Sequence, residues 1–362
     1  MRALYGLIDA PQSCPDKEPS PTCGAQGAGM TRPTVNDIAR EAGVSLATVD
    51  RVLNARPGVR AKTISAVNDA ITRLGYVRDL AAANLARSRS YRMIALLPDG
   101  DSQFVQTLAE ALTEAAALAA ATRLRLDLLR YPPEDMHVLS NLLAGFQPEE
   151  VAGVALMAPE TPVIRDAVRA LRQRGIPLVA LGSDLPNTGR DHFVGIDSHA
   201  AGRTAGVLMG RFCRGLSGRV LVIADSMLLR DSIERRRGFD EVLLADFPAL
   251  DVMPTLETHG SADQLRRAVG DCLAATPDVV GLYLLGSGHR ALAAFLRDRG
   301  LLGRFVVIGH ELTPHTRQAL MAGHLDAVIA QNPGHLARSA LRVLRAKADR
   351  IPIDEGLSLI HI

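Results

Sequence analysis

Cysteine, aromatic residues and net charge are scarce in this sequence, and the scarcity of cysteine argues against two classes of protein. The 362 residues carry 41 basic and 39 acidic side chains, so the formal charge of +2, taken over the whole chain, says nothing about a nucleic-acid partner. Aromatic residues make up 4%, and Trp is absent. Four cysteines without CxxC or metal-ligand spacing argue against a disulfide framework and a structural zinc site. The cysteines are Cys14, Cys23, Cys213 and Cys272.

Long apolar runs and catalytic motifs are missing too. No apolar run reaches about 18 residues, so no transmembrane helix is expected, and an N-terminus broken by Asp9 and Pro11 is a poor secretory signal. The sequence has no GxGxxG fingerprint, no nucleophile elbow and no convincing Ser/His/Asp set or carboxylate pair. We therefore predict a cytoplasmic protein that is not an enzyme and holds no metal or cofactor. The histidines, which lack HxH and HxxxH spacing, include His192, His289, His310, His315 and His324.

Charge and composition divide the chain into parts. Residues 1–30 are rich in Pro and Gly without helical or strand periodicity, so we expect a disordered, non-native tail and translation from Met30. Residues 31–92 carry eleven basic and five acidic groups, a local charge of +6, whereas the chain from residue 93 onward carries −3. A basic head on a mildly acidic body is therefore hidden in the near-neutral total.

The body alternates short apolar runs with amphipathic stretches. Continuous apolar runs, rather than strict alternation, indicate parallel strands that are covered on both faces. Alternating strands and helices predict a doubly wound α/β architecture, and the length allows two such sheets. The predicted strands are 93–98, 124–129, 151–159, 176–183, 193–197, 219–226, 279–287, 304–311 and 325–331. The predicted helices include 104–121, 162–174, 200–214 and 262–275.

The head, residues 31–78, has the pattern of a helix-turn-helix. Thr34 with Asp37 approximates a capping box, Gly43 ends the first helix and Ser45 caps a second helix, LATVDRVLN. A third helix, with an apolar stripe that begins at Ile64, is predicted to end at Gly75. An ordinary three-helix packing domain with a basic face is the alternative on pattern alone.

A helix-turn-helix places the start of its second helix in the major groove. The side chains best placed there for base contacts are Leu46, Ala47 and Arg51, of which Arg51 can fork onto guanine. Small or basic groups near these helices suit phosphate contacts. The predicted phosphate contacts are Thr34, Ser45, Asn54, Arg60, Lys62 and Thr63.

The segments TVNDIAREAGVSLATVDRVLN, PGVRAKTISAVNDAITRLGY and AAANLAR resemble the start of the lactose-repressor (LacI) family of bacterial transcription regulators. The body resembles that family more loosely, in GIDSHAAGR, ERRRGF, GHEL and AQNP. The resemblance implies three head helices, a hinge helix within 79–92 and two lobes of the type I periplasmic-binding-protein fold. It also implies a dimer in which Leu85 wedges into the minor groove of a palindromic operator.

In such a body, a ligand binds at the carboxyl ends of the strands, between an N-lobe (93–216 plus 331–350) and a C-lobe (217–330). The resemblance and position along the chain assign a small polar effector, a sugar or polyol, to residues after the predicted strands. Ser287 and Glu311 depart from the residues that the family commonly has there. The candidate effector contacts are Asp99, Gln103, Phe104, Asp197, Arg235, Ser287, Glu311 and Gln331.

The function that these features predict is a ligand-responsive DNA-binding regulator, a repressor acting as a homodimer or a tetramer. A solute-binding protein for sugar transport is the alternative, and a sugar-converting enzyme is a third reading without a catalytic constellation. The final residues 357–362, LSLIHI, have a back-translation that reads as the adapter end of a transposase sequencing library. We expect those residues to be foreign and the native C-terminus to be missing.

Overall fold

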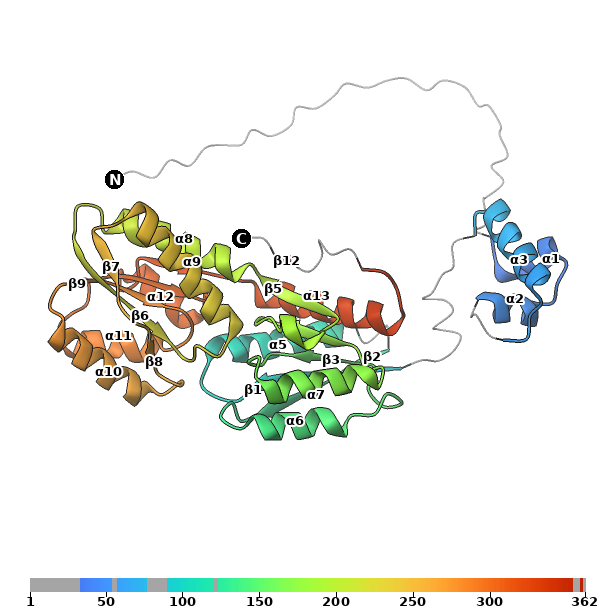
Figure 1. The fold of residues 1–362 in the computed structure, drawn as a ribbon, viewed down its shortest axis with the longest axis horizontal. Coiled ribbons are helices and arrows are strands. Elements are labelled where there is room, and N and C mark those ends of the chain that lie inside the picture. Colours follow the sequence, from blue (N-terminus) through green and yellow to red (C-terminus); the bar gives the residue numbers. More distant parts are fainter. Residues whose placement is uncertain (1–32, 54–56, 77–89, 120–122, 354–358, 361–362) are drawn as a thin grey trace, which may run out of the picture. The chain divides into compact units, whose positions relative to one another are not determined.

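The computed structural model describes residues 33–53, 57–76, 90–119, 123–353 and 359–360 (Figure 1). The chain divides into two compact units, Met1–Ala83 and Asn84–Ile362. The predicted tail, 1–30, lies outside the described residues. Within the described ranges, no helix is both long enough and apolar enough to cross a membrane.

The first unit contains three short helices, and their ends follow the predicted caps. The carboxylate Oδ2 of Asp37 accepts hydrogen bonds from the Thr34 backbone N–H (2.8 Å) and hydroxyl (2.7 Å). Gly43 ends the first helix at φ +62°, a left-handed conformation that glycine adopts easily. The Ser45 hydroxyl accepts a hydrogen bond from the Thr48 backbone N–H at 3.2 Å. The helices are α1 (Val35–Ala42), α2 (Leu46–Leu53) and α3 (Ala61–Leu74).

A small apolar core joins these three helices. Ile38, Val49 and Val67, one from each helix, are fully buried. Of the predicted stripe on α3, Leu74 packs against this core, but Ile64 is 39% exposed. Val52 and Leu53 of α2 are partly buried against the same core, whereas Leu46, Ala47 and Arg51 stay exposed.

A parallel six-stranded sheet forms the first lobe of the second unit, in the order β12-β5-β4-β3-β1-β2. One face of the sheet packs against α5 and α13, and the other packs against α6 and α7 (Figure 1). The strands are β1 (Tyr91–Pro98), β2 (Leu124–Tyr131), β3 (Gly153–Leu156), β4 (Leu178–Leu181), β5 (His192–Ile196) and β12 (Leu359–Ile360). The helices are α5 (Gln103–Leu118), α6 (Met136–Gly145), α7 (Pro162–Gln173) and α13 (Pro333–Ala348).

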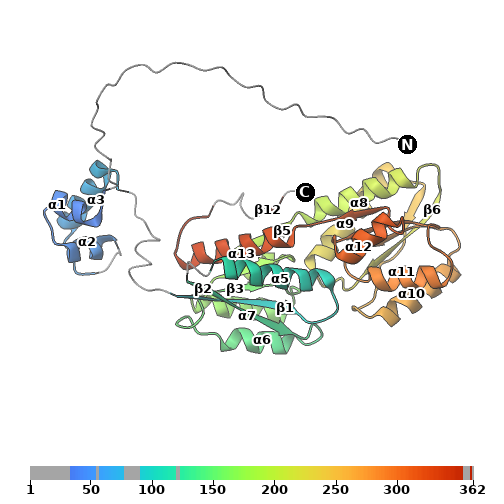
Figure 2. The same ribbon diagram turned by 180° about the vertical axis from the view of Figure 1, so that it is seen from behind.

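A second parallel sheet, in the order β11-β10-β9-β6-β7 with β8 also paired to β6, forms the other lobe. Helices α8 and α9 cover one face, and α10, α11 and α12 cover the other (Figure 2). The strands are β6 (Gly218–Ala224), β7 (Leu250–Val252), β8 (Leu256–Glu257), β9 (Val279–Leu284), β10 (Val306–His310) and β11 (Ala327–Ile329). The helices are α8 (Ser198–Phe212), α9 (Arg230–Asp246), α10 (Ala262–Ala275), α11 (His289–Asp298) and α12 (Pro314–Met321).

The fold class predicted from the sequence is confirmed, with differences at two boundaries. Each predicted strand is present, whereas the short β7, β8 and β12 were not predicted because two or three residues carry too little periodicity. The boundary expected at residue 216 assigned α8 to the first lobe, but Ala201 and Met209 pack in the core of the second lobe. The linker expected to reach residue 92 ends earlier, because β1 begins at Tyr91. Leu359, in the segment expected to be foreign, pairs with Gly195 of β5.

Helices α8 and α9 approach each other closely because glycines face backbone atoms. A Cβ atom on Gly202 would lie 2.0 Å from the carbonyl oxygen of Arg235, and a Cβ on Gly238 would lie 2.2 Å from that of His199. Real Cβ atoms do not approach other atoms so closely, so both positions require glycine unless the helices move apart. This contact fixes the position of the α9 backbone at Arg235.

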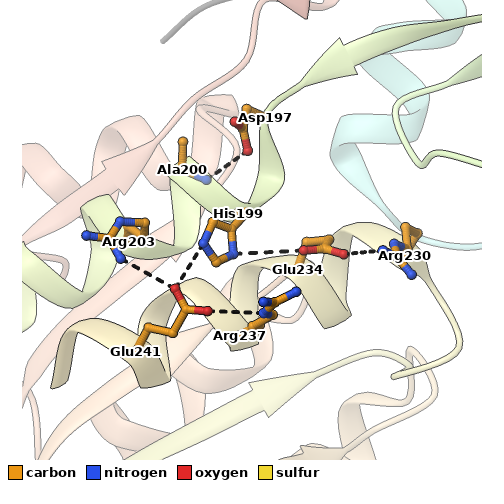
Figure 3. Close-up of polar contacts among 8 residues, drawn as sticks. All are labelled: Asp197, His199, Ala200, Arg203, Arg230, Glu234, Arg237 and Glu241. Carbon is orange, nitrogen blue, oxygen red and sulfur yellow. Dashed lines mark hydrogen bonds and ion pairs between the residues drawn. The ribbon is translucent and has the colours of Figure 1, made fainter. Parts of the chain in front are cut away.

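Charged side chains line the outer edge of the same helix pair (Figure 3). The His199 imidazole on α8 lies 3.1 Å from Glu241 and 3.8 Å from Glu234, both on α9. Arg203 also lies 3.4 Å from Glu241. These side chains are partly exposed, and such pairs contribute little stability in water. The glycine contacts, rather than this network, therefore determine the helix spacing.

Candidate functional site

The surface of α2 presents the three side chains that the sequence assigned to base contacts. Leu46 is 50% exposed, and Ala47 and Arg51 are also exposed, whereas Val49 between them is fully buried. The helical period separates these two sets, since Val49 faces the head core and the others do not. An exposed leucine and an exposed arginine on one helix offer an apolar contact for a methyl group and a forked hydrogen-bond donor.

The predicted phosphate contacts have different environments. Ser45, Arg60 and Lys62 are exposed, and Thr63 is partly buried in the first turn of α3. Thr34 is exposed, but its hydroxyl already donates a hydrogen bond to Asp37. Two further predicted contacts, Asn54 and the hinge residue Leu85, lie outside the described residues.

In the body, a buried polar cluster forms at the carboxyl ends of β10 and β11. The Arg235 side chain, only 2% exposed, donates a hydrogen bond from Nη1 to the Leu285 carbonyl oxygen at 2.6 Å. Its Nη2 donates to Glu311 Oε1 at 3.3 Å, and Gln331 Nε2 donates to the same oxygen at 2.8 Å. Asp231, one turn earlier on α9, lies 3.6 Å from Nη1. The fold thus brings together three of the predicted effector residues, which are Arg235, Glu311 and Gln331.

Glu311 sits at the centre of this cluster in a constrained environment. Its backbone φ is +72°, a left-handed conformation that costs a non-glycine residue about 1–2 kcal/mol. The Glu311 N–H donates to the Ile329 carbonyl oxygen at 2.9 Å, which ties the end of β10 to the end of β11. Burial raises the pKa of the Glu311 carboxyl to about 7, against the lowering effect of Arg235 and Gln331. Near neutral pH, the ionised and the protonated form of this carboxyl are therefore both populated, so it can accept a hydrogen bond or donate one.

Several buried polar atoms in the cluster have no hydrogen-bond partner within the described part of the chain. They are Glu311 Oε2, Gln331 Oε1, Asp231 Oδ1 and Arg235 Nε. An unpaired buried polar atom costs about 1–3 kcal/mol of folding free energy. Such atoms are therefore rare in protein cores, and their presence calls for an explanation. Three acceptor oxygens and one N–H donor match the hydroxyl groups of a small ligand, because each hydroxyl both donates and accepts.

The other predicted effector residues are not joined to this cluster by any contact in the described residues. Asp99 is exposed after β1, and Gln103 is partly buried at the start of α5. Phe104 is 8% exposed and packs in the core of the first lobe. The Asp197 carboxylate is exposed and caps α8 through the Ala200 N–H at 2.9 Å. Ser287 donates its hydroxyl to Asp225 Oδ2 at 2.6 Å.

Sequence reasoning missed two acidic residues of this region. Asp225 follows β6 directly and accepts the Ser287 backbone N–H (3.1 Å) as well as its hydroxyl. Asp231 lies four residues before Arg235 on the same face of α9. The sequence contained a signal for each residue. Asp225 lies at the end of a predicted strand, and Asp231 has i, i+4 spacing to Arg235, a predicted effector contact.

Three histidines lie near the cluster without forming a metal site. His310 Nε2 is 2.8 Å from the Tyr283 hydroxyl, and burial lowers the pKa of His310 well below its usual value. Burial also lowers the pKa of His289 to about 4, and that of His315 in the same direction. Within the described ranges, no group of three or more His, Cys, Asp or Glu residues could hold a metal ion.

These shifted groups predict opposite pH dependences of stability. His289 titrates near pH 4 in the fold against about 6.5 when unfolded, so its contribution to stability is lost as the pH falls below 6.5. Glu311 titrates near 7 against about 4.5, so its contribution is lost as the pH rises above 4.5. When the pH falls from 7 to 5, the unfolding free energy of His289→Gln should decrease by about 2 kcal/mol less than that of the wild type. Over the same interval, the unfolding free energy of Glu311→Gln should decrease by about 2 kcal/mol more than that of the wild type. Urea unfolding at both pH values measures this, and parallel changes in all three proteins contradict it.

The fold and the position of the site define the class of protein. The chain matches the periplasmic binding protein domain over residues 94–350 and the bacterial regulatory proteins of the lacI family over residues 34–79. This chain belongs to the lacI family of bacterial regulatory proteins, with a periplasmic-binding-protein-like body. That is a family of regulators and not of enzymes.

Known proteins resemble the chain to different extents. Catabolite control protein A of Priestia megaterium is 30% identical over 168 residues, which is 46% of this chain and 48% of that protein. The chain thus spans about half the length of the curated relatives that it matches. Among solved structures, GanP, a glucose-galactose binding protein of Geobacillus stearothermophilus, superposes with a TM-score of 0.67 at 18% identity, over 75% of this chain and 95% of that one.

A second similar structure is a solute-binding protein of an ABC transporter from Burkholderia graminis, in complex with D-arabinose. It has a TM-score of 0.67 at 21% identity and covers 75% of this chain and 93% of the other. At such identities, these two structures support the shared two-lobed fold alone.

Proposed function

We propose that this protein is a ligand-responsive transcriptional regulator that binds operator DNA through its head and a small hydroxyl-rich molecule through its body. The observation that carries the proposal is the exposed face of α2, with Leu46, Ala47 and Arg51, in the same chain as the Arg235–Glu311–Gln331 cluster. A transport protein would need only the second of these features.

The head is suited to direct readout of the major groove. Arg51 presents a forked donor that matches guanine O6 and N7, and Leu46 and Ala47 offer apolar contacts for a thymine methyl group. The exposed Arg60 and Lys62 at the start of α3 supply charge for the phosphates, which gives affinity without sequence preference. In this proposal, two copies of the chain read the two halves of a palindrome, and Leu85 in the hinge enters the minor groove.

The body is suited to a ligand with several hydroxyl groups, such as a sugar or a polyol. The Arg235 guanidinium is occupied by Leu285 and Glu311, so it is not free to fork onto a ligand carboxylate or phosphate. The unpaired atoms left in the cluster are mostly acceptors, and they favour a donor-rich neutral ligand over an anion. Ligand binding would alter the spacing of the hinges in a dimer, with a typical coupling of about 1–3 kcal/mol. Repression relieved by the ligand is the simplest form of this coupling.

Arg51→Ala should weaken binding to the selected operator by about 5- to 100-fold, because one bidentate arginine–guanine contact is worth about 1–3 kcal/mol of discrimination. The operator is first obtained by selection from random DNA with the full chain. Fluorescence anisotropy at fixed salt then compares operator and unrelated DNA. Arg73→Ala is the matched control, since Arg73 is an exposed head arginine that pairs with Glu41 at 3.1 Å. Equal losses on both DNAs, or from both variants, would contradict a base contact by Arg51.

The function as a whole is tested by titrating a panel of sugars and polyols into the full chain by calorimetry, with and without operator DNA. A regulator binds one of them with an affinity that the operator changes, and the ligand changes operator affinity by the same factor. A solute-binding protein for transport would bind a sugar without any effect of DNA. Turnover of the ligand would reject the regulator.

A further inference from the structure

We propose that the second lobe has another ligand site, at the amino-terminal edge of its sheet. The site takes a small carboxylate with an apolar body, such as an aromatic ring or a branched aliphatic chain. It goes beyond the proposed function, because neither the DNA-binding surface nor the polar cluster contributes to it.

A cavity between α10, α11 and the start of β10 forms the site. Its volume is about 190 Å³, and its apolar walls include Leu273 of α10, Phe295 of α11, and Leu301 and Phe305 before β10. A closed apolar cavity of about 150 Å³ accepts benzene, so this partly open cavity has room for one six-membered ring with a carboxyl group. Both phenylalanines are largely buried, so these walls belong to the packed interior of the lobe and not to a loosely packed surface.

Two exposed arginines, Arg299 and Arg304, line the cavity and supply its positive charge. The Arg299 guanidinium carbon lies 5.5 Å from the centroid of the Phe295 ring, and that of Arg304 lies 5.4 Å from the Phe305 ring. Stacking holds a guanidinium by its face and leaves its N–H edge available for bidentate hydrogen bonds to a carboxylate.

Neither of these arginines forms an ion pair with a carboxylate in the ranges that the structure describes. Other arginines of the same lobe do so, including Arg236 with Asp240 at 2.7 Å and Arg237 with Glu241 at 3.1 Å. Two guanidinium groups without a carboxylate partner, beside a cavity with leucine and phenylalanine walls, match a ligand that joins negative charge to an apolar body. A neutral sugar would leave both charges unused.

The cavity and the polar cluster lie at opposite edges of the sheet. Pro277 and Phe305, which line the cavity, precede β9 and β10, whereas Leu285 and Glu311 of the cluster follow those strands. Because all strands of this sheet are parallel, residues before and after them lie at opposite ends. Occupation of the cavity is therefore a separate input to the same lobe.

Calorimetric titration of the full chain with benzoate tests the proposal, with benzyl alcohol and inorganic phosphate as probes for the ring alone and the charge alone. We expect one benzoate per chain, bound more tightly than either other probe. Arg299→Gln and Arg304→Gln should each weaken benzoate binding about tenfold, because each removes a charge-assisted pair. Arg297→Gln is the matched control, since Arg297 is exposed on the same helix and does not line the cavity.

A filling variant tests the volume independently of charge. A Cβ on Gly270 would lie 3.5 Å from the Phe295 ring, so Gly270→Leu extends into the cavity and should abolish benzoate binding while circular dichroism shows a folded chain. The proposal is overturned if benzoate does not bind the wild type, or if both glutamine variants bind it unchanged. It is also overturned if benzyl alcohol or phosphate binds as tightly. None of these outcomes bears on operator binding, which is measured separately.

Discussion

Gly202→Ala is expected to lower the free energy of unfolding by about 3 kcal/mol or more, although alanine favours a helix by about 1 kcal/mol over glycine. The new Cβ would lie 2.0 Å from the carbonyl oxygen of Arg235, and a backbone atom cannot rotate away as the end of a side chain can. Helices α8 and α9 must therefore separate. Urea unfolding followed by circular dichroism measures the loss.

Gly270→Ala supplies the control for that experiment, because it makes the same chemical change in a helix of the same lobe. The nearest atom to its Cβ is a Phe295 ring carbon at 3.5 Å, which is an ordinary contact. This variant should gain about 0.5–1 kcal/mol from helix propensity alone. If both variants change stability in the same direction, close helix packing at Gly202 is not the cause.

Arg235→Met is expected to cost about 3–5 kcal/mol at pH 8, because it leaves the buried Glu311 carboxylate without its ionic partner. The cost should be smaller at pH 6, where Glu311, whose pKa burial raises to about 7, takes up a proton and loses its charge. A structural arginine without this ionic coupling would give the same loss at both pH values. Unfolding free energies at the two pH values distinguish these outcomes.

The double variant Arg235→Met/Glu311→Gln completes a thermodynamic cycle with the two single variants. It removes both charges and should recover most of the stability that Arg235→Met loses at pH 8. Asp231, whose side chain is 13% exposed, keeps some access to water and should add less. Strictly additive losses would show that Arg235 and Glu311 are not coupled, and would weaken the description of the cluster as one unit.

Arg235 and Glu311 also show how much of the site could be predicted from the sequence. Arg235 and Glu311 were predicted as effector contacts from the family resemblance and from their positions along the chain, and the structure brings them to 3.3 Å of each other. Arg235 is a buried group and not a surface charge, because it is 2% exposed. Phe104 was predicted by the same reasoning, but its ring packs in the core of the first lobe, and its contact with an effector remains a prediction.

Local interactions explain why the head was the more predictable part. The Thr34–Asp37 capping box, the Gly43 stop and the Ser45 cap depend on residues at most four positions apart, so their pattern is visible in the sequence. Nine of the body strands and their parallel direction were predictable for a similar reason, since buried parallel strands have continuous apolar runs.

The sequence by itself therefore determined the three-helix head, the order of strands and helices, the exposed face of α2 and the family resemblance. Only the tertiary structure decided that α8 belongs to the second lobe, since apolar periodicity shows that a helix buries a face but not which sheet receives it. The pairing of Arg235 with Glu311 and Gln331, the involvement of Asp225 and Asp231, and the cavity between Arg299 and Arg304 were decided in the same way. Each joins side chains from separate elements, and their distances depend on packing across the whole lobe rather than on spacing along the chain.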